Sequence, residues 1–250
     1  MTSRDQWLVW PRRAGQDSST TLIIMPHAGA GAAAFVPWAQ WADPRIRVGI
    51  VRLPGRESRW AEPALQNMEE VVHGLTEAVH ASVFGSVALF GHCSGATIAF
   101  ELAHRLSLDG PARPSLLFPS SATPPHQSWQ GDRLSRLADN ELVAALRRLG
   151  GTPEAVLTNS ELLELVLPAV RADFAIQESY VYRPSPPLAN PIQAICGARD
   201  QSTGPSVAAG WRTYTTSWFE ISSFPSDHFF IWQHQESIMR LMCRKALEVA

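Results

Sequence analysis

The five residues Gly91-His92-Cys93-Ser94-Gly95 decide the fold expected for this chain. An apolar run, residues 87–90, comes directly before them, and residues 96–108 follow with helical spacing of apolar side chains. A G-x-nucleophile-x-G frame between a strand and a helix is a nucleophile elbow, a sharp turn that projects a reactive side chain from the top of a parallel sheet. Side chains at the two flanking positions would clash with strand and helix, which explains the glycines. The frame predicts Cys93 as a nucleophile.

Two other interpretations of this stretch stay open. Cys93 could be a small buried filler, with the glycines marking an unrelated turn. Ser94 could be the nucleophile, although it is out of frame with both glycines. The backbone N–H of Ser94, directly after the nucleophile, is better suited to stabilise an oxyanion.

Short β-like runs alternate with helical stretches on both sides of the elbow. This alternation is typical of an α/β fold with a mostly parallel central sheet flanked by helices. Strands are expected at residues 20–25, 47–52, 87–90, 115–118, 191–196, 210–214 and 217–221, and helices at 67–83, 96–108 and 233–249.

The alternation is interrupted by residues 126–182, which have helical patterns only, clearest at 139–149 and 161–180. Pro168 should kink or divide the second of these helices. A helical block inserted between strands is what a lid over an active site would look like, within a single domain of residues 1–250. Trp129, Leu165 and Phe174 are candidates to line a pocket beneath it, or they pack the helices together.

Composition excludes several classes of function. The 250 residues carry a net charge of −2, so the composition does not indicate a basic surface for binding nucleic acid. Three widely spaced cysteines argue against a disulfide framework, and no cysteine or histidine cluster has metal-ligand spacing. No apolar run is long enough for a membrane span and no signal peptide is recognised. We expect a cytoplasmic protein without a metal or other cofactor.

Two residues late in the chain complete a catalytic triad. Asp200 follows the strand expected at 191–196, and His228 follows the strand at 217–221. Both positions lie just past the carboxyl ends of strands, where α/β sheets hold their chemistry. The order nucleophile, acid, base predicts that His228 takes the proton of Cys93 while Asp200 orients the imidazole. Asp227 is the rival acid, but adjacent side chains rarely align for such a relay.

The chain resembles the type II thioesterases, stand-alone editing hydrolases of polyketide and nonribosomal peptide synthesis. The matching segments, in order, are Pro26-His27-Ala28-Gly29, Leu53-Pro54-Gly55-Arg56 with Glu62-Pro63, the elbow, Leu149-Gly150-Gly151-Thr152-Pro153, Asp200 and His228-Phe229-Phe230. The resemblance implies an α/β-hydrolase fold and a second oxyanion N–H from Ala28. It also implies substrate contacts at His27 and Phe229. The implied partner is a phosphopantetheinylated acyl or peptidyl carrier protein, or a small acyl thioester, and we expect a monomer.

Cys93 departs from the family, which normally has serine in the elbow. A cysteine exchanges one thioester for another, so the acyl group stays activated. The main expectation is therefore hydrolysis of acyl thioesters, and the alternative is a Cys-dependent acyltransferase or cyclase that delivers the acyl group to an amine or thiol. An unrelated esterase or peptidase activity and a non-catalytic carrier-binding role are further alternatives. Cys93 could be natural or an engineered replacement of serine.

Overall fold

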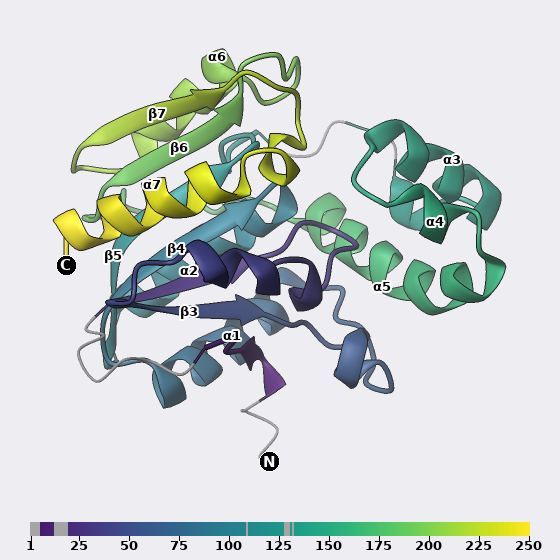
Figure 1. Cartoon of the computed structure of the whole chain (residues 1–250), viewed down its shortest axis with the longest axis horizontal. Coiled ribbons are helices and arrows are strands. Elements are labelled where there is room, and N and C mark those ends of the chain that lie inside the picture. The colour runs from purple at the N-terminus through teal and green to yellow at the C-terminus, as the bar shows by residue number, and fades with distance from the viewer. Residues whose placement is uncertain (1–5, 13–19, 109, 128–130, 132) are drawn as a thin grey trace.

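The computed structural model describes residues 6–12, 20–108, 110–127, 131 and 133–250. Its centre is a seven-stranded sheet with the strand order β1-β3-β2-β4-β5-β6-β7 (Figure 1). All neighbouring strands pair in parallel except β1, which is antiparallel to β3. The strands are β1 (Leu8–Val9), β2 (Thr20–Met25), β3 (Ile46–Val51), β4 (Gly85–His92), β5 (Ala112–Ser120), β6 (Ile192–Gly197) and β7 (Phe219–Phe224).

Helices cover both faces of the sheet. On one face, α1 (Met68–Ser82) and α2 (Ser94–Leu108) pack apolar side chains such as Leu75 and Leu102 against the strands. On the other face, α7 (Gln235–Glu248) packs together with the 3₁₀ helix η3 (Val36–Trp41). Burial of these two layers is the main source of stability. The expected α/β fold with a mostly parallel sheet is confirmed.

The central position of β4 explains how the elbow is held. Residues 87–92 of β4 are all buried, between β2 on one side and β5 on the other. Helix α2 begins at Ser94, one residue after Cys93, so the chain turns from a buried strand into a buried helix within a single residue. Such a turn is fixed by packing on all sides, which keeps the side chain at its tip in one place.

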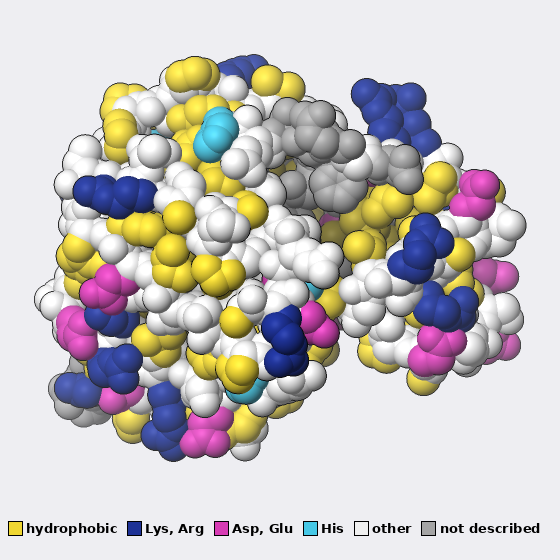
Figure 2. All heavy atoms as spheres, turned by 90° about the horizontal axis from the view of Figure 1, so that it is seen from above, with side chains coloured by type: hydrophobic (Ala, Val, Ile, Leu, Met, Phe, Trp, Pro, Cys, Tyr) yellow, Lys and Arg dark blue, Asp and Glu magenta, His cyan; other side chains and the backbone are white. Residues whose placement is uncertain are grey.

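A helical segment, residues 134–179, lies between β5 and β6. It contains the 3₁₀ helix η5 (Leu134–Arg136), α3 (Asp139–Leu149), α4 (Glu154–Leu157) and α5 (Ser160–Ser179). Its own small core includes Leu142, Leu146 and Phe174. The segment forms a lobe at one end of the sheet (Figure 1), and a hollow separates part of it from the main body (Figure 2). The expectation of helices in this region is confirmed.

Local structure differs from or adds to the expectations at three places. Residues 210–214 are not a strand but part of the 3₁₀ helix η6 (Ala209–Tyr214), whose three-residue period places Trp211 and Tyr214 on one buried side. Pro168 does not divide α5, because its ring lies on the exposed side, where the carbonyl left without a donor can bind water. Strand β1 has only two residues and no alternation to reveal it.

The suggested pocket-lining residues of the helical segment do not line a pocket together. Leu165 is 65% exposed, on the outer side of α5. Phe174 is buried among the helices of the segment, which favours the packing interpretation. Trp129 lies outside the described residues.

Candidate active site

The elbow brings Cys93 to a strained turn at the carboxyl end of β4. Cys93 has φ +51°, in the left-handed region that is uncommon for residues other than glycine. A side chain on Gly91 would place its Cβ 2.1 Å from the Gly95 carbonyl oxygen, and one on Gly95 would lie 2.4 Å from the Met25 oxygen. Both glycines are therefore required by backbone contacts. The Cys93 N–H donates to the Ser120 carbonyl of β5 at 2.8 Å, which ties the turn to the neighbouring strand.

His228 and Asp200 meet at the ends of β7 and β6. The His228 Nδ1 lies 2.7 Å from the Asp200 Oδ2. Burial lowers the pKa of His228, but hydrogen bonds to Asp200 and Cys93 and the charges of both residues outweigh it and raise the pKa to about 10. The structure thus brings Cys93, His228 and Asp200 together, with the imidazolium form of His228 stabilised between two acidic groups.

The Asp200 carboxylate is held by four donors besides His228. Its Oδ1 accepts from the Ser202 N–H at 2.9 Å, the Ser202 hydroxyl at 2.8 Å and the Thr203 N–H at 3.1 Å, and its Oδ2 accepts from the Thr203 hydroxyl. Burial raises the pKa of Asp200, but its hydrogen bonds with His228, Thr203 and Ser202 hold it well below the usual range. Asp227 is exposed, and among the described residues the carboxylate paired with His228 is that of Asp200, not that of Asp227.

The backbone N–H groups of Ser94 and Ala28 are the two predicted oxyanion donors. Ser94 is the first residue of α2, so its N–H has no partner within its own helix. Ala28 belongs to the loop after β2, where the Ala28 carbonyl accepts from the His27 ring at 3.0 Å and the Ala30 N–H donates to the His27 carbonyl at 3.0 Å. Neither the Ser94 N–H nor the Ala28 N–H has an acceptor among the described residues.

His27 and Phe229 lie in an aromatic cluster beside the triad. The ring centroids of His27 and Phe229 are 5.1 Å apart, and that of His92, from the elbow, is 5.8 Å from His27 and 5.4 Å from His228. Burial lowers the pKa of His27 to about 4, so this ring is neutral. Phe229 also reaches the helical segment, since a Cβ on Gly151 would lie 2.3 Å from the Phe229 ring. The cluster forms a wall of the site rather than a second acid–base group.

A small cavity of about 20 Å³ adjoins the Ala28 and Ser94 side of the site. Its walls are mostly apolar and come from the ends of β2 and β3, the start of α2 and the inner side of α5. The lining includes Met25, Val51, Leu53, Ile98 and Ile176. At this volume the recess has room for about one water molecule, so it can take no more than a small alkyl group next to the two N–H groups.

A buried ion pair joins Arg56, in the loop after β3, to Asp173 of α5. Arg56 donates to Asp173 at 2.8 Å and 2.6 Å, and the two side chains are only 10% and 6% exposed. Asp173 also accepts from the Gly29 N–H at 2.8 Å, and Arg56 donates to the Ala30 carbonyl at 3.0 Å. Farther along α5, the Gln177 amide donates to the Ser94 carbonyl at 3.0 Å. Helix α5 therefore contacts both the Ala28 loop and the elbow.

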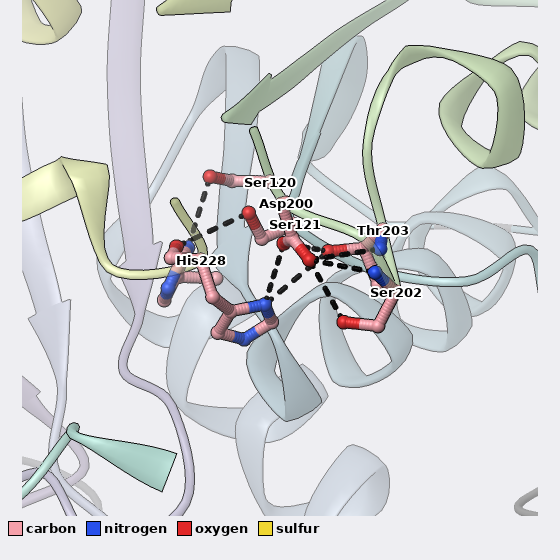
Figure 3. A network of polar contacts seen from close by, with 7 residues as sticks. Ser120, Ser121, Asp200, Ser202, Thr203 and His228 are labelled. Carbon is pink, nitrogen blue, oxygen red and sulfur yellow. Dashed lines mark hydrogen bonds and ion pairs between the residues drawn. The ribbon is translucent and has the colours of Figure 1, made fainter. Parts of the chain in front are cut away.

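Several of these polar residues were not predicted from the sequence. Ser202 and Thr203 hydrogen-bond Asp200, Ser121 hydrogen-bonds the His228 carbonyl, and Ser120 hydrogen-bonds His92 of the elbow (Figure 3). Hydroxyl residues after an aspartate, as in Asp200-Gln201-Ser202-Thr203, are a known signal for a turn closed on the carboxylate and could have indicated Ser202 and Thr203. No comparable pattern marks Ser120 and Ser121.

The described part of the chain contains neither a metal-binding cluster nor a membrane-spanning helix. No group of three or more histidine, cysteine, aspartate or glutamate side chains is placed to hold a metal ion there. None of the described helices combines the length and the apolar character needed to cross a membrane.

Comparisons with known proteins identify the family. The thioesterase domain model matches residues 20–246. Thioesterase PikA5 of Streptomyces venezuelae is 37% identical over 89% of this chain and 80% of its own length. The gramicidin S biosynthesis protein GrsT of Aneurinibacillus migulanus is 33% identical over 98% of this chain and 96% of its own. The structure of the type II thioesterase BorB from the borrelidin biosynthetic cluster matches with a TM-score of 0.89 and 37% identity, covering 98% of this chain and 100% of that one. The chain therefore belongs to the thioesterase family, as a type II thioesterase and a hydrolase of the α/β-hydrolase fold.

Proposed function

We propose that this thioesterase cleaves acyl groups from the phosphopantetheine arm of a carrier protein through an acyl-Cys93 intermediate. His228 is the acid–base group, Asp200 orients it, and the N–H groups of Ala28 and Ser94 stabilise the oxyanion. The observation that carries the proposal is that the His228 ring lies 2.7 Å from Asp200 and, at 5.4 Å between ring centroids, beside His92 of the elbow, with Cys93 among the groups that raise the pKa of His228.

In the first step, the Cys93 sulfur attacks the carbonyl carbon of the acyl thioester. His228 takes the proton of the Cys93 thiol, so the attacking group is a thiolate beside an imidazolium. Negative charge then develops on the carbonyl oxygen and is stabilised by the two N–H donors. The bond to the pantetheine sulfur breaks, and the departing thiolate takes the proton of His228. The products are the acyl-Cys93 thioester and a free pantetheine thiol.

In the second step, water replaces the thiol. Acylation removes the negative charge and the hydrogen bond of the Cys93 sulfur, two of the causes that raise the pKa of His228. The neutral imidazole can then accept a proton from water as the water oxygen attacks the acyl carbon. Cleavage of the bond to Cys93 releases a carboxylic acid and restores the thiolate–imidazolium pair.

The proposed substrate follows from the relatives and from the site. Relatives named for gramicidin S biosynthesis and for the borrelidin cluster support an acyl or peptidyl carrier protein as the partner. The small apolar cavity beside Ala28 and Ser94 would take the first carbons of the acyl group, with His27 and Phe229 as neighbouring walls. We propose that residues 126–182 form a lid over this site within one domain, and that the arm enters through the hollow beside the lobe (Figure 2).

Acyl transfer is the second candidate function, and Cys93 itself favours it. An acyl-cysteine keeps the activation of a thioester, and amines and thiols compete with water for a thioester better than for an ester. The test is the partition of products from one acyl-pantetheine substrate with saturating amine or thiol acceptors, in the wild type and in Cys93→Ser. Exclusive formation of the free acid by the wild type would exclude transfer to those acceptors.

The main test is intact-protein mass spectrometry after rapid mixing with a panel of acyl-pantetheine thioesters. We expect one acyl group on the wild type, on the peptide that contains Cys93, and none on Cys93→Ala. Cys196→Ala is the matched control, because Cys196 is buried in β6 and should leave the labelling unchanged. Acylation of Cys93→Ala at the wild-type rate would refute Cys93 as the nucleophile.

A further inference from the structure

Ser121 has an unusual backbone conformation next to the active site. Its φ is +41°, in the left-handed region that glycine adopts without steric cost and other residues avoid. Among the described residues, only Glu57, Cys93 and Ser121 combine a positive φ with a side chain. Strained residues of this kind cluster at active sites, where surrounding contacts hold them in place. The strained backbone at Ser121 therefore suggests that its side chain makes a contact that glycine could not make.

The hydroxyl of Ser121 makes that contact. It donates to the backbone carbonyl of His228 at 3.2 Å, across the space between the end of β5 and the loop after β7 (Figure 3). It is the only hydrogen-bond donor to this carbonyl within the described residues. Ser121 is 2% exposed, so water does not readily replace the bond.

The backbone around Ser121 is fixed on both sides. The Ser121 N–H donates to the Ile195 carbonyl of β6 at 2.9 Å. The preceding Ser120 accepts from the Cys93 N–H at 2.8 Å, and its hydroxyl lies 3.0 Å from the His92 Nδ1. Ser120 thus holds the elbow, and Ser121 holds the loop of the base. These two consecutive residues set the spacing between the Cys93 backbone and the His228 backbone.

We infer that Ser121 is a positioning residue that places His228 against Cys93. The inference rests on the proposed function, in which His228 exchanges a proton with Cys93. Asp200 fixes the direction of the imidazole through Nδ1, whereas Ser121 fixes the main chain from which the imidazole extends. Without the Ser121 hydroxyl, the loop of His228 can move away from the elbow, and the hydrogen bond between His228 and Cys93 weakens.

Two variants separate this role from a purely structural one. Ser121→Ala removes the hydroxyl and keeps the strained backbone, and Ser121→Gly removes both the hydroxyl and the strain. Ser107→Ala is the matched control, since the Ser107 hydroxyl also donates to a backbone carbonyl, that of Ala103, but within α2. The readouts are the rate of Cys93 acylation as a function of pH, the KM for an acyl-pantetheine, and the stability toward urea.

We expect both Ser121 variants to acylate about 3- to 10-fold more slowly with little change in KM, the loss typical of one buried hydrogen bond. The descending limb of the pH profile should move to lower pH, because a weaker contact with Cys93 raises the pKa of His228 less. Ser121→Gly should unfold at a urea concentration close to that of the wild type, because relief of the backbone strain offsets the lost hydrogen bond, and Ser107→Ala should keep the wild-type rate. Wild-type acylation and an unchanged limb in Ser121→Gly would overturn the inference.

The result is distinguishable from a failure of the proposed function. His228→Gln and Cys93→Ala, measured in parallel, should abolish acylation. Normal acylation in either would overturn the proposed function and this inference with it. Loss of acylation in both, together with a fully active Ser121→Gly, would overturn the role of Ser121 alone.

Discussion

Replacing Asp173 by alanine should destabilise the protein strongly, and the structure gives the size of the effect. The change removes the acceptor of two Arg56 hydrogen bonds at 2.8 Å and 2.6 Å and of the Gly29 N–H at 2.8 Å. Arg56 is 10% exposed and its Nε has no acceptor among the described residues, so the guanidinium would be left charged and largely buried. Breaking one partner of a buried pair costs about 3–5 kcal/mol. Asp173→Ala should therefore lower the free energy of unfolding by about that amount, and Tm by roughly 6–20 °C at about 2–4 °C per kcal/mol for a chain of this size.

Urea unfolding followed by tryptophan fluorescence and circular dichroism measures this loss. The control is Glu154→Ala, which breaks the exposed pair of Arg147 and Glu154 and should change stability little. In the double variant Arg56→Met/Asp173→Leu, much of the loss should be recovered, because no charge remains buried. If Asp173→Ala unfolds at the same urea concentration as Glu154→Ala, the ion pair between α5 and the Arg56 loop does not have the stabilising role assigned to it.

Three further predictions concern the site itself. Gly95→Ala should lower the acylation rate about 100-fold or more, because its Cβ would press on the Met25 and Pro26 carbonyls and shift the Ala28 loop. Gly150→Ala, where a Cβ meets nothing within 4 Å, should keep the rate, although the φ of +77° makes alanine there cost some stability. The raised pKa of His228 stabilises the folded protein fully below pH about 6.5, and this contribution should disappear as pH rises to about 10. The difference in urea stability between the wild type and His228→Gln, measured at pH 6 and pH 10, should therefore shrink; a constant difference would contradict the assignment. Ile176→Ala should enlarge the cavity and favour longer acyl chains in a competition between acyl-pantetheines, with no such shift in the exposed Leu165→Ala.

The sequence predicted correctly those features whose residues lie close together along the chain and all serve one tight turn. The glycines of the elbow, the buried strand before it and the helix after it are all required by one tight turn, so their spacing predicted both the fold and Cys93. The positions of Asp200 and His228 followed from chain order and strand ends, and the structure brings both side chains to Cys93.

The remaining features depend on contacts between segments that are distant in sequence. Ser121 and His228 are 107 residues apart, and Arg56 and Asp173 are 117 apart, so no local pattern connects them. The segment 210–214 was misread because apolar residues three apart in a 3₁₀ helix do not differ clearly from a short buried strand. Leu165 and Phe174 could not be separated by periodicity alone, because the lobe has a core of its own.

Strand β7 is an edge strand of the sheet, and this has a consequence for how the protein loses activity. Strand β7 has a neighbour on one side only, and none of its residues is fully buried, whereas β4 is enclosed by β2 and β5. Edge strands with few buried contacts are among the parts of a protein that open locally before the whole molecule unfolds. Because β7 leads directly to His228, such an opening would detach the imidazole while the elbow and the main core stay folded. Inactivation should thus precede the loss of global structure as denaturant is added, and amide hydrogens of β7 should exchange faster than those of β4.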